Sequence, residues 1–247
     1  RSHVGVVRGR RVSGMLALRP TATSEPHAMH YDTATNAHGM RHDPFKALVV
    51  PRPIGWISTV GSDGVLNLAP YSFFNGVSDR PPMVMFSSAG HKDSLRNVRE
   101  TGEFTCSLAG WELRDQMNLS SAMVAADVDE FALAGLQTAP SRFVRPPRVA
   151  ESPAALECRH WKTVEMPSDP KRPDLAYSVV FGLVVGIYID ERYIRDGRVD
   201  TGAMRPLARL GYMDYAVVTP ETMFSLNRPL VAEDGRSASV PGGGWDG

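Results

Sequence analysis

The residues best suited to holding a charged ligand lie at the start of a predicted helix. Lys92 directly precedes a helix that Asp93 or Ser94 would cap and that Gly102 would end. The first turn of a helix has free backbone N–H groups and a positive dipole end, which together favour an anion. Lys92 adds a full charge and Ser94 a hydroxyl. The pattern indicates a phosphate site, and a simply capped helix with a solvated lysine is the alternative.

A second polar group stands among aromatic residues in NLAPYSFFN, residues 67–75. The aromatic side chains could belong to a core, but amides and hydroxyls interleave with them and leave no clean inside and outside. Such a mixture suits a planar heterocycle with hydrogen-bonding edges. The candidate residues are Asn67, Tyr71, Ser72, Phe73, Phe74 and Asn75. Together with the helix start, they favour a flat ligand that carries a phosphate.

The segment that leads into these residues is predicted to be a β-hairpin. Strand-like residues flank the turn GSDG, residues 61–64. Ser58 and Thr59 end the first strand, where at most one of the two hydroxyls can face a cleft. Arg52 lies between two prolines that hold the backbone extended. A guanidinium fixed in this way suits phosphate or carboxylate, and a solvated surface arginine is the alternative.

Strand signals dominate the rest of the chain and predict the scaffold. Further strands are expected over residues 83–88, 103–110, 156–166 and 176–190. Gly182 and Gly186 mark bends in the longest of them, and a strand bent at glycines can curl a sheet into a barrel. Residues 156–166 alternate Leu156, Cys158, His160 and Lys162 with Glu157, Arg159, Trp161 and Thr163, as in a strand with one wet face.

Helices are fewer and are expected over residues 91–102, 111–122 and 128–135, with a helical turn over 220–224. Strands and helices do not alternate as in a doubly wound sheet. The pattern predicts a curled, mainly β, antiparallel core with peripheral helices.

Composition limits the classes of partner. The chain has 247 residues, with 27 Lys and Arg against 27 Asp and Glu, so no overall field favours nucleic acid or an anionic membrane. No run approaches the roughly 20 apolar residues of a membrane span. Cys106 and Cys158 lie in strand-like runs without metal spacing. We expect them to be reduced, partly buried thiols, as suits a protein of the cytoplasm.

The ends of the chain are expected to lie outside the folded domain. Residues 1–28 are arginine-rich and predict a disordered extension or an expression remnant, with an Arg-rich targeting peptide as the alternative. Residues 29–230 are predicted to form the domain, and the glycine-rich residues 231–247 a flexible tail.

Taken in order, these motifs resemble the flavin reductase-like family of FMN-binding split barrels. The resemblance covers about residues 29–228. It rests on RPIGWIST, NLAPYSFFN and KDSLRNVRETGEF, and on DVDEFALAGL and PLARLGYMDY further along the chain. It implies a Greek-key split β-barrel, a homodimer, and FMN bound non-covalently near the subunit interface.

The resemblance also assigns candidate contacts position by position. The strand that would line the FMN chain and ring contributes Trp56, Ser58 and Thr59. The loop beside the isoalloxazine contributes Tyr71, Ser72, Phe73, Phe74 and Asn75. The helix start at the phosphate contributes Lys92, Asp93 and Ser94. Arg52 and Arg209 are further candidates.

The function that the resemblance implies is NAD(P)H-dependent flavin reduction, with hydride transfer from NADH or NADPH to N5 of FMN. The cofactor would carry the chemistry, so no catalytic side chain and no metal site is expected. His42, His91 and His160 are expected to be surface or satisfied histidines, with His91 the best placed to lie near the flavin.

Three alternatives stay open. FMN could be a fixed prosthetic group for the reduction or oxidation of a small molecule. The protein could be a non-enzymatic electron carrier or flavin store. The barrel could also hold another flat phosphorylated cofactor, such as haem, pyridoxal phosphate or a deazaflavin.

Overall fold

The structure is a computed structural model that describes residues 29–240. The predicted extension, residues 1–28, and residues 241–247 of the predicted tail lie outside the described part. The chain divides into two units between Asp43 and Pro44. In the first unit, a turn is closed by the amide of Asn36, which donates to the carbonyl of Asp32 at 2.9 Å. The predicted domain limits, residues 29 and 230, stay a prediction.

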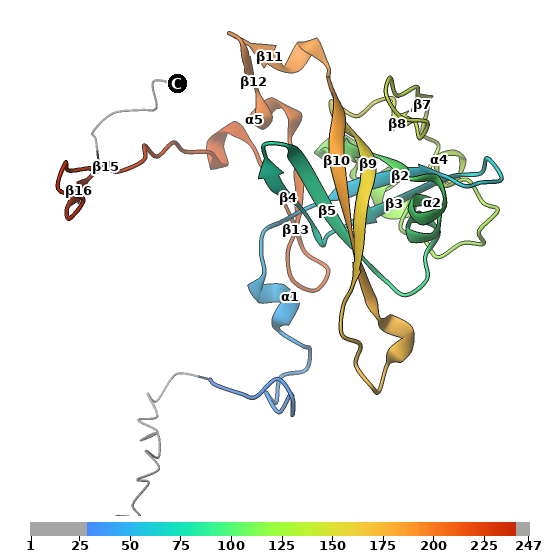
Figure 1. The fold of residues 1–247 in the computed structure, drawn as a ribbon, viewed down its shortest axis with the longest axis horizontal. Helices are drawn as coiled ribbons and strands as arrows, with labels where there is room; N and C mark the ends of the chain where they lie inside the picture. Colours follow the sequence, from blue (N-terminus) through green and yellow to red (C-terminus); the bar gives the residue numbers. More distant parts are fainter. Residues whose placement is uncertain (1–28, 241–247) are drawn as a thin grey trace, which may run out of the picture. The chain divides into compact units, whose positions relative to one another are not determined.

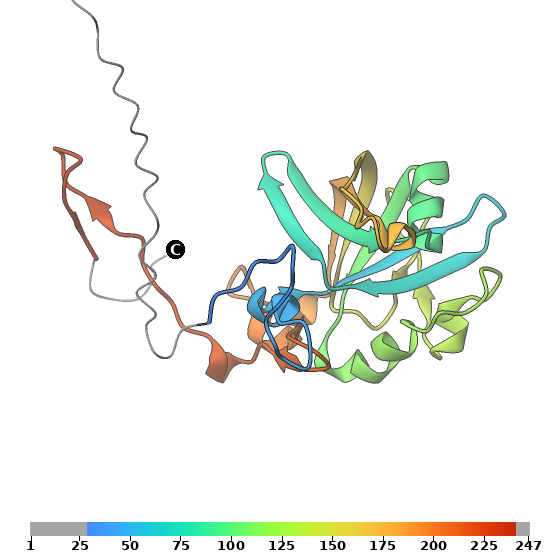
Figure 2. The same cartoon turned by 90° about the horizontal axis from the view of Figure 1, so that it is seen from below.

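The second unit is built on a seven-stranded sheet in which every pairing is antiparallel (Figure 1). In spatial order the strands are β3 (Leu66–Tyr71), β2 (Gly55–Val60), β6 (Glu103–Leu108), β9 (Ala154–Glu165), β10 (Tyr177–Ile189), β5 (Pro82–Ala89) and β4 (Phe74–Asp79). Figure 2 shows the curl of these strands from below. The expectation of a mainly β, antiparallel core with few helices is confirmed, as is the hairpin around residues 61–64.

Smaller elements surround the main sheet. A three-stranded sheet joins β1 (Arg52–Pro53), β13 (Leu207–Arg209) and β14 (Tyr215–Val217). The two-residue strands form three pairs: β7 (Thr138–Ala139) with β8 (Arg148–Val149), β11 (Ile194–Arg195) with β12 (Arg198–Val199), and β15 (Leu230–Val231) with β16 (Ala238–Ser239). The last of these pairs crosses the predicted boundary between the domain and the tail, because β15 begins at Leu230.

The helices are short. They are α1 (Phe45–Leu48), α2 (Asp93–Thr101), α3 (Arg114–Leu119), α4 (Glu130–Leu133) and α5 (Thr201–Met204), with 3-10 turns at Trp111–Leu113, Pro173–Leu175, Glu191–Tyr193 and Pro220–Thr222. The helix expected over 111–122 is thus split, and the one expected over 128–135 is shorter because Asp129 caps it. No helix of the described residues is long and apolar enough to cross a membrane.

Helix α2 packs its apolar face against the main sheet and positions the polar residues at its start. Leu95 and Val98 are buried, and Gly102 ends the helix in a left-handed conformation, as predicted. The N-cap is Lys92 rather than Asp93 or Ser94. The predicted cap was wrong because Ser94 lies inside the first turn, where its hydroxyl bonds to Asn67.

Two glycines allow β10 to bend over packed rings. A Cβ at Gly182 would overlap the ring of Phe104, and one at Gly186 would overlap the ring of Phe143. The register between β9 and β10 shifts at both glycines. The predicted close backbone approach is confirmed, and these shifts give the sheet local irregularities where it curls.

The expected two-faced alternation of residues 156–166 fails at Glu157. Glu157 is 5% exposed, next to the fully buried Cys158. The loop after β7 covers this part of the strand, and its backbone amides at Arg142 and Phe143 donate to the Glu157 carboxylate. These bonds offset the cost of burying a charge, so the strand has no wet face here.

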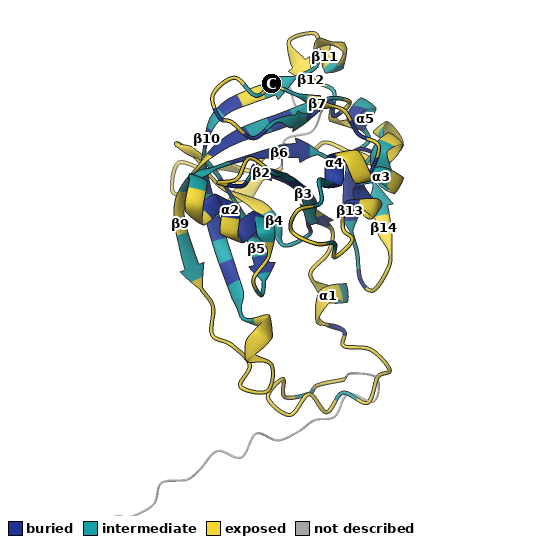
Figure 3. Cartoon of the chain, turned by 90° about the vertical axis from the view of Figure 1, so that its right-hand side faces the viewer, coloured by how far each residue is buried: buried dark blue, intermediate teal, exposed yellow. Residues whose placement is uncertain are grey.

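Two apolar clusters lie on opposite faces of β2. Figure 3 shows this strand as largely buried. Ile57 packs into one cluster and Trp56 into the other. Cys106 and Cys158 lie in the first cluster as free thiols, in line with the prediction. Burial raises the pKa of Cys106 to about 12, so this thiol is protonated at neutral pH.

Candidate functional site

A cavity of about 780 Å³, here called the ring cavity, opens beside β4, β5 and β10. Its lining includes five of the predicted contacts: Arg52, Ser72, Phe73, Phe74 and Asn75. Side chains on one face of the sheet form its floor. Asn75 stands opposite Met85, which stands opposite Phe181 on the next strand, so the three form one row across the sheet. The walls are mostly apolar and aromatic, as suits a planar ring.

Arg52 is buried and its guanidinium is held by the backbone. It is 6% exposed and donates to the carbonyls of Lys46, Val49 and Leu210. Its Nε is buried without a hydrogen-bond partner among the described residues. Burial and the neighbouring Arg209 lower the pKa of Arg52. The alternative of a solvated surface arginine is therefore wrong, and Arg52 first of all fixes the segments at the rim of the ring cavity.

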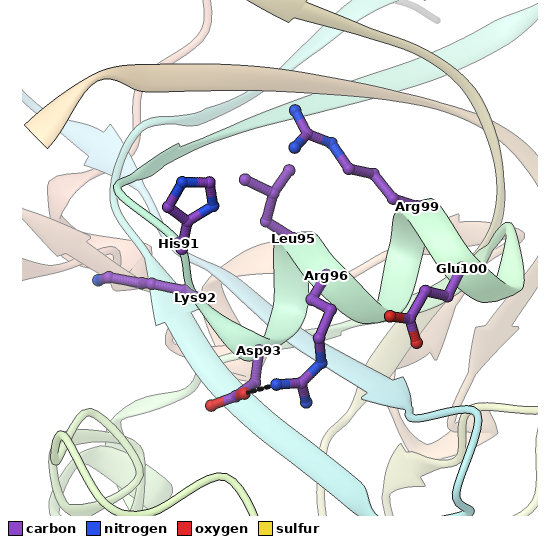
Figure 4. Close-up of a pocket in the computed structure, with 7 residues that line it drawn as sticks. All are labelled: His91, Lys92, Asp93, Leu95, Arg96, Arg99 and Glu100. Atoms are coloured by element: carbon purple, nitrogen blue, oxygen red, sulfur yellow. Dashed lines mark ion pairs between the residues drawn. The ribbon is translucent and has the colours of Figure 1, made fainter. Parts of the chain in front are cut away.

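A second cavity of about 270 Å³ lies along the first turns of α2 and is here called the helix-start cavity. Figure 4 shows its seven lining residues: His91, Lys92, Asp93, Leu95, Arg96, Arg99 and Glu100. Arg96 is paired with Asp93 at 2.6 Å, and Arg99 is paired with Glu165 on β9. Among the described residues, Lys92 has no ion-pair partner. Its Nζ lies 5.8 Å from the ring centre of Tyr71.

A buried hydrogen-bond network fixes Ser94 below this cavity. Glu130, which is 6% exposed, accepts from Asn67 Nδ2 at 3.0 Å and from the Leu68 amide at 2.9 Å. Because the Asn67 amide donates to a carboxylate, its Oδ1 faces the other way and accepts from Ser94 Oγ at 2.8 Å. The hydroxyl hydrogen of Ser94 is therefore used in the hydrogen bond to Asn67. Ser94 could donate to a bound phosphate only if this network rearranged.

Tyr71 and Ser88 line neither cavity and carry buried hydroxyls. Both side chains are buried, and neither hydroxyl has a hydrogen-bond partner among the described residues. Burial raises the pKa of Tyr71, and the nearby Ser94 and Ser88 hydroxyls oppose this shift. Both hydroxyl oxygens are as inaccessible as those of Ser58 and Thr59, so a bound ligand could reach them only if this part of the core rearranged.

Six predicted contacts line neither cavity: Tyr71 and Ser94, described above, and Trp56, Ser58, Thr59 and Arg209. Trp56, Ser58 and Thr59 are fully buried. Trp56 Nε1 donates to Ser120 Oγ at 2.9 Å, Ser58 donates to the Pro147 carbonyl, and Thr59 donates to Asn67 Oδ1. Their side chains have no exposed atom to offer because β2 is covered on both faces. Arg209 lines a third cavity of about 420 Å³, where it donates to Tyr215 and to the Tyr212 carbonyl.

Several lining residues were not identified from the sequence. Met85, Val179 and Phe181 form much of the floor of the ring cavity. In the sequence they belong to apolar runs that read as core. The signal that could have found them is the two-residue period, which places them on the face shared with Asn75 once the strand order is known. Glu130 was missed because its partners are distant in the sequence.

Comparisons with known proteins identify the family of the chain. The family model described as flavin reductase like domain matches residues 47–208. An uncharacterized protein of Deinococcus radiodurans is 36% identical over 216 residues, which cover 83% of this chain and 91% of that protein.

Two solved structures are also similar. 2-Nitrobenzoate 2-nitroreductase NbaA of Pseudomonas fluorescens has a TM-score of 0.71 and 26% identity, covering 83% of this chain and 100% of that one. Nitrilotriacetate monooxygenase component B of Bacillus cereus has a TM-score of 0.69 and 25% identity, covering 86% and 100%. The chain therefore belongs to the flavin reductase-like family and has its split-barrel fold. Family and neighbours together indicate a flavin-related oxidoreductase.

Proposed function

We propose that the protein is an FMN-dependent oxidoreductase whose flavin ring lies in the ring cavity and whose phosphate lies at the start of α2. The observation that carries this proposal is the pairing of an apolar, aromatic-lined cavity with a second cavity at a helix N-terminus, where Lys92 has no ion-pair partner among the described residues. The two cavities border one segment of chain, since Ser87 lines the first and His91 the second. FMN is a flat ring joined to a phosphate by a polar chain, so its ring would fit the first cavity and its phosphate the second.

Different residues would contact the ring and the phosphate of such a cofactor. Phe73 and Phe74 offer ring contacts, and Ser72 and Asn75 offer hydrogen bonds at the same rim. Lys92 and the free amides of the first turn of α2 favour the phosphate through charge and dipole. FMN, when bound, supplies hydride chemistry at N5, and the protein supplies position and charge. Trp56, Ser58 and Thr59 then support the site from the core instead of contacting the cofactor through their side chains.

The electron donor that we propose is NADH or NADPH, with free flavin as the acceptor. Family membership supports flavin reduction as the reaction. The homodimer implied by the resemblance belongs to the same proposal, because the ring cavity is open and has exposed apolar residues such as Val77 and Phe45 at its margin.

A second candidate keeps FMN as a fixed prosthetic group that acts on a small molecule. The likeness to a nitroreductase that acts on 2-nitrobenzoate favours it. Steady-state kinetics separate the two. If FMN is a substrate, the rate of NADPH oxidation saturates with free FMN well above the enzyme concentration. If FMN is fixed, the rate is complete at one FMN per subunit and then depends on the added acceptor. Absence of NADPH and NADH oxidation under both conditions would contradict the proposed reductase.

A further inference from the structure

An apolar crevice of about 240 Å³ adjoins the ring cavity, and apart from Pro53 and Phe74 its lining residues take no part in the flavin site proposed above. It is bordered by β6, the start of β9, and the segment that leads into β13. Pro53 and Phe74 line both this crevice and the ring cavity. The two spaces therefore share walls, and the ring of Phe74 stands between them.

Gly55 makes this position of Phe74 possible. A Cβ at Gly55 would overlap the Phe74 ring at Cδ2. The ring therefore packs directly over the Gly55 backbone, and any larger residue at position 55 would push it out of place. Phe74 is half-buried, so its ring is enclosed on this side and accessible on the other. This arrangement is that of a partition between two compartments.

The lining of the crevice excludes charged ligands. It contains no Asp, Glu, Lys, Arg or His, and its polar members are Cys106 and Ser107. The Cys106 thiol is neutral, because burial raises its pKa to about 12. Ser107 Oγ already accepts from the Val149 amide at 3.1 Å. A charged group placed here would lose its hydration without gaining a partner, which is costly.

The size of the crevice limits the occupant to about one ring. An apolar cavity of about 150 Å³ in another protein stays dry and binds benzene. A space of about 240 Å³ therefore accommodates one six-membered ring with a small substituent. A long peptide side chain or an extended cofactor would not fit.

We propose that this crevice binds the apolar body of a small, uncharged, single-ring compound, with Phe74 as the residue that sets the size limit. Its role as the acceptor or substrate subsite rests on the function proposed above, because only then does the adjoining cavity hold the flavin. The binding itself does not depend on the flavin and is tested without it.

The test uses the full chain without cofactor, with fluorobenzene as the probe and fluorine NMR as the measurement. Fluorobenzene should show line broadening and a chemical shift change that saturate with protein, whereas 4-fluorobenzoate, its charged counterpart, should not. Ala154→Leu adds three carbons to a half-buried position of the lining and should weaken fluorobenzene binding by at least about tenfold. Ala216→Leu on β14, also half-buried but outside this lining, is the matched control and should bind as the wild type does.

The assignment of the site does not depend on that variant alone. In the wild type, intermolecular NOEs from fluorobenzene should reach the methyl groups of Leu156 and Leu207. Absence of saturable binding, equal binding of the benzoate, or NOEs to other methyl groups would overturn the proposal. Binding that appears only when the protein is diluted to monomers would also overturn it, since a second copy would then fill the crevice.

A separate titration with FMN keeps the two proposals distinguishable. FMN binding without fluorobenzene binding would reject the crevice and leave the flavin site. Fluorobenzene binding without FMN binding would reject the flavin site and leave the crevice.

If both the flavin site and the crevice site are confirmed, Phe74→Ala should merge the ring cavity with the crevice. The ratio of kcat/KM for a two-ring acceptor to that for a one-ring acceptor should then rise above the wild-type ratio by roughly tenfold or more. An unchanged ratio would overturn the role of Phe74 as the size limit.

Discussion

Replacing Lys92 with methionine should weaken FMN binding while leaving the fold almost unchanged. Lys92 is exposed and stands at the N-cap of α2, where the free amides of the first turn and the helix dipole favour a phosphate. The Lys92 side chain approaches the Tyr71 ring, with Nζ at 5.8 Å from the ring centre, and forms no ion pair with another described residue. Methionine keeps most of the aliphatic length and removes the charge, so the variant isolates the electrostatic contribution.

The expected size of the effect follows from this setting. A hydrogen bond to a charged group contributes about 1.5–3 kcal/mol, which corresponds to a roughly ten- to hundredfold loss of affinity. The loss to stability should be smaller, because an exposed cation–π contact contributes about 0.5–1 kcal/mol. Ser94→Ala alone should act differently. The Ser94 hydroxyl donates into the Glu130–Asn67 network, so its removal should lower stability and change FMN affinity less than Lys92→Met does.

The assay is titration of the apoprotein with FMN, followed by quenching or enhancement of flavin fluorescence, at two salt concentrations. Lys171→Met, in the loop between β9 and β10, is the control for loss of a surface lysine and should bind FMN as the wild type does. The wild-type affinity should fall with salt more steeply than that of Lys92→Met, since one charge contact is lost in the variant. Equal affinity of Lys92→Met and wild type at low salt would refute the placement of the phosphate at α2.

Four further predictions concern the scaffold and its assembly. Gly182→Ala should lower the free energy of unfolding by about 1–3 kcal/mol in urea because its Cβ would overlap a core ring. Gly76→Ala should change it by less than about 1 kcal/mol, because its Cβ would meet only the Met83 carbonyl oxygen, at an ordinary contact distance of 4.0 Å. Glu130→Ala should cost about 1–3 kcal/mol for each amide donor left unpaired, and Glu130→Gln should cost less because one oxygen can still accept both bonds; equal losses would contradict the network. The pKa of Cys106 is raised from 9.0 to about 12, so its contribution to stability should be complete below pH 9 and fall as the pH rises toward 12; Cys106→Ala should flatten that slope in pH-dependent urea unfolding. Sedimentation at micromolar concentration should give a homodimer, and a monomer would contradict the interface at the ring cavity.

The sequence predicts the scaffold well where local patterns decide it. Short apolar runs bounded by Gly and Pro locate the strands, and Gly102 locates the end of α2. Strand order could not be read in the same way. The pairings of β10 with β5 and of β6 with β2 and β9 join segments far apart in the sequence, and periodicity within one strand says nothing of its neighbours.

The candidate site was predicted only in part. As with the strand order, the sequence does not show which residues meet in space. Residues in the loop between β3 and β4 lie at the ring cavity because a break in alternation marks a departure from core packing. Ser58 and Thr59 look equally polar in the sequence, yet the structure satisfies them inside the core. A hydroxyl bonded inside the core, such as that of Thr59, and one at a cavity, such as that of Ser72, have the same sequence signature, and only their three-dimensional surroundings distinguish them.

Glu157 and Glu130 show the same limit for charged residues. Alternation placed Glu157 beside solvated neighbours, but a loop distant in sequence buries it and supplies its hydrogen bonds. Glu130 reaches Asn67 across more than sixty positions. Such contacts arise from the tertiary fold and carry no local pattern.

The visible spectrum of the FMN-loaded protein, recorded under anaerobic conditions before and after addition of NADPH or NADH, tests the central proposal most directly. The account predicts that the protein retains FMN through gel filtration at about one per subunit, and that the visible flavin bands bleach when the nicotinamide donor is added. A protein that retains no FMN, or whose bound FMN stays oxidised with both donors, would contradict it.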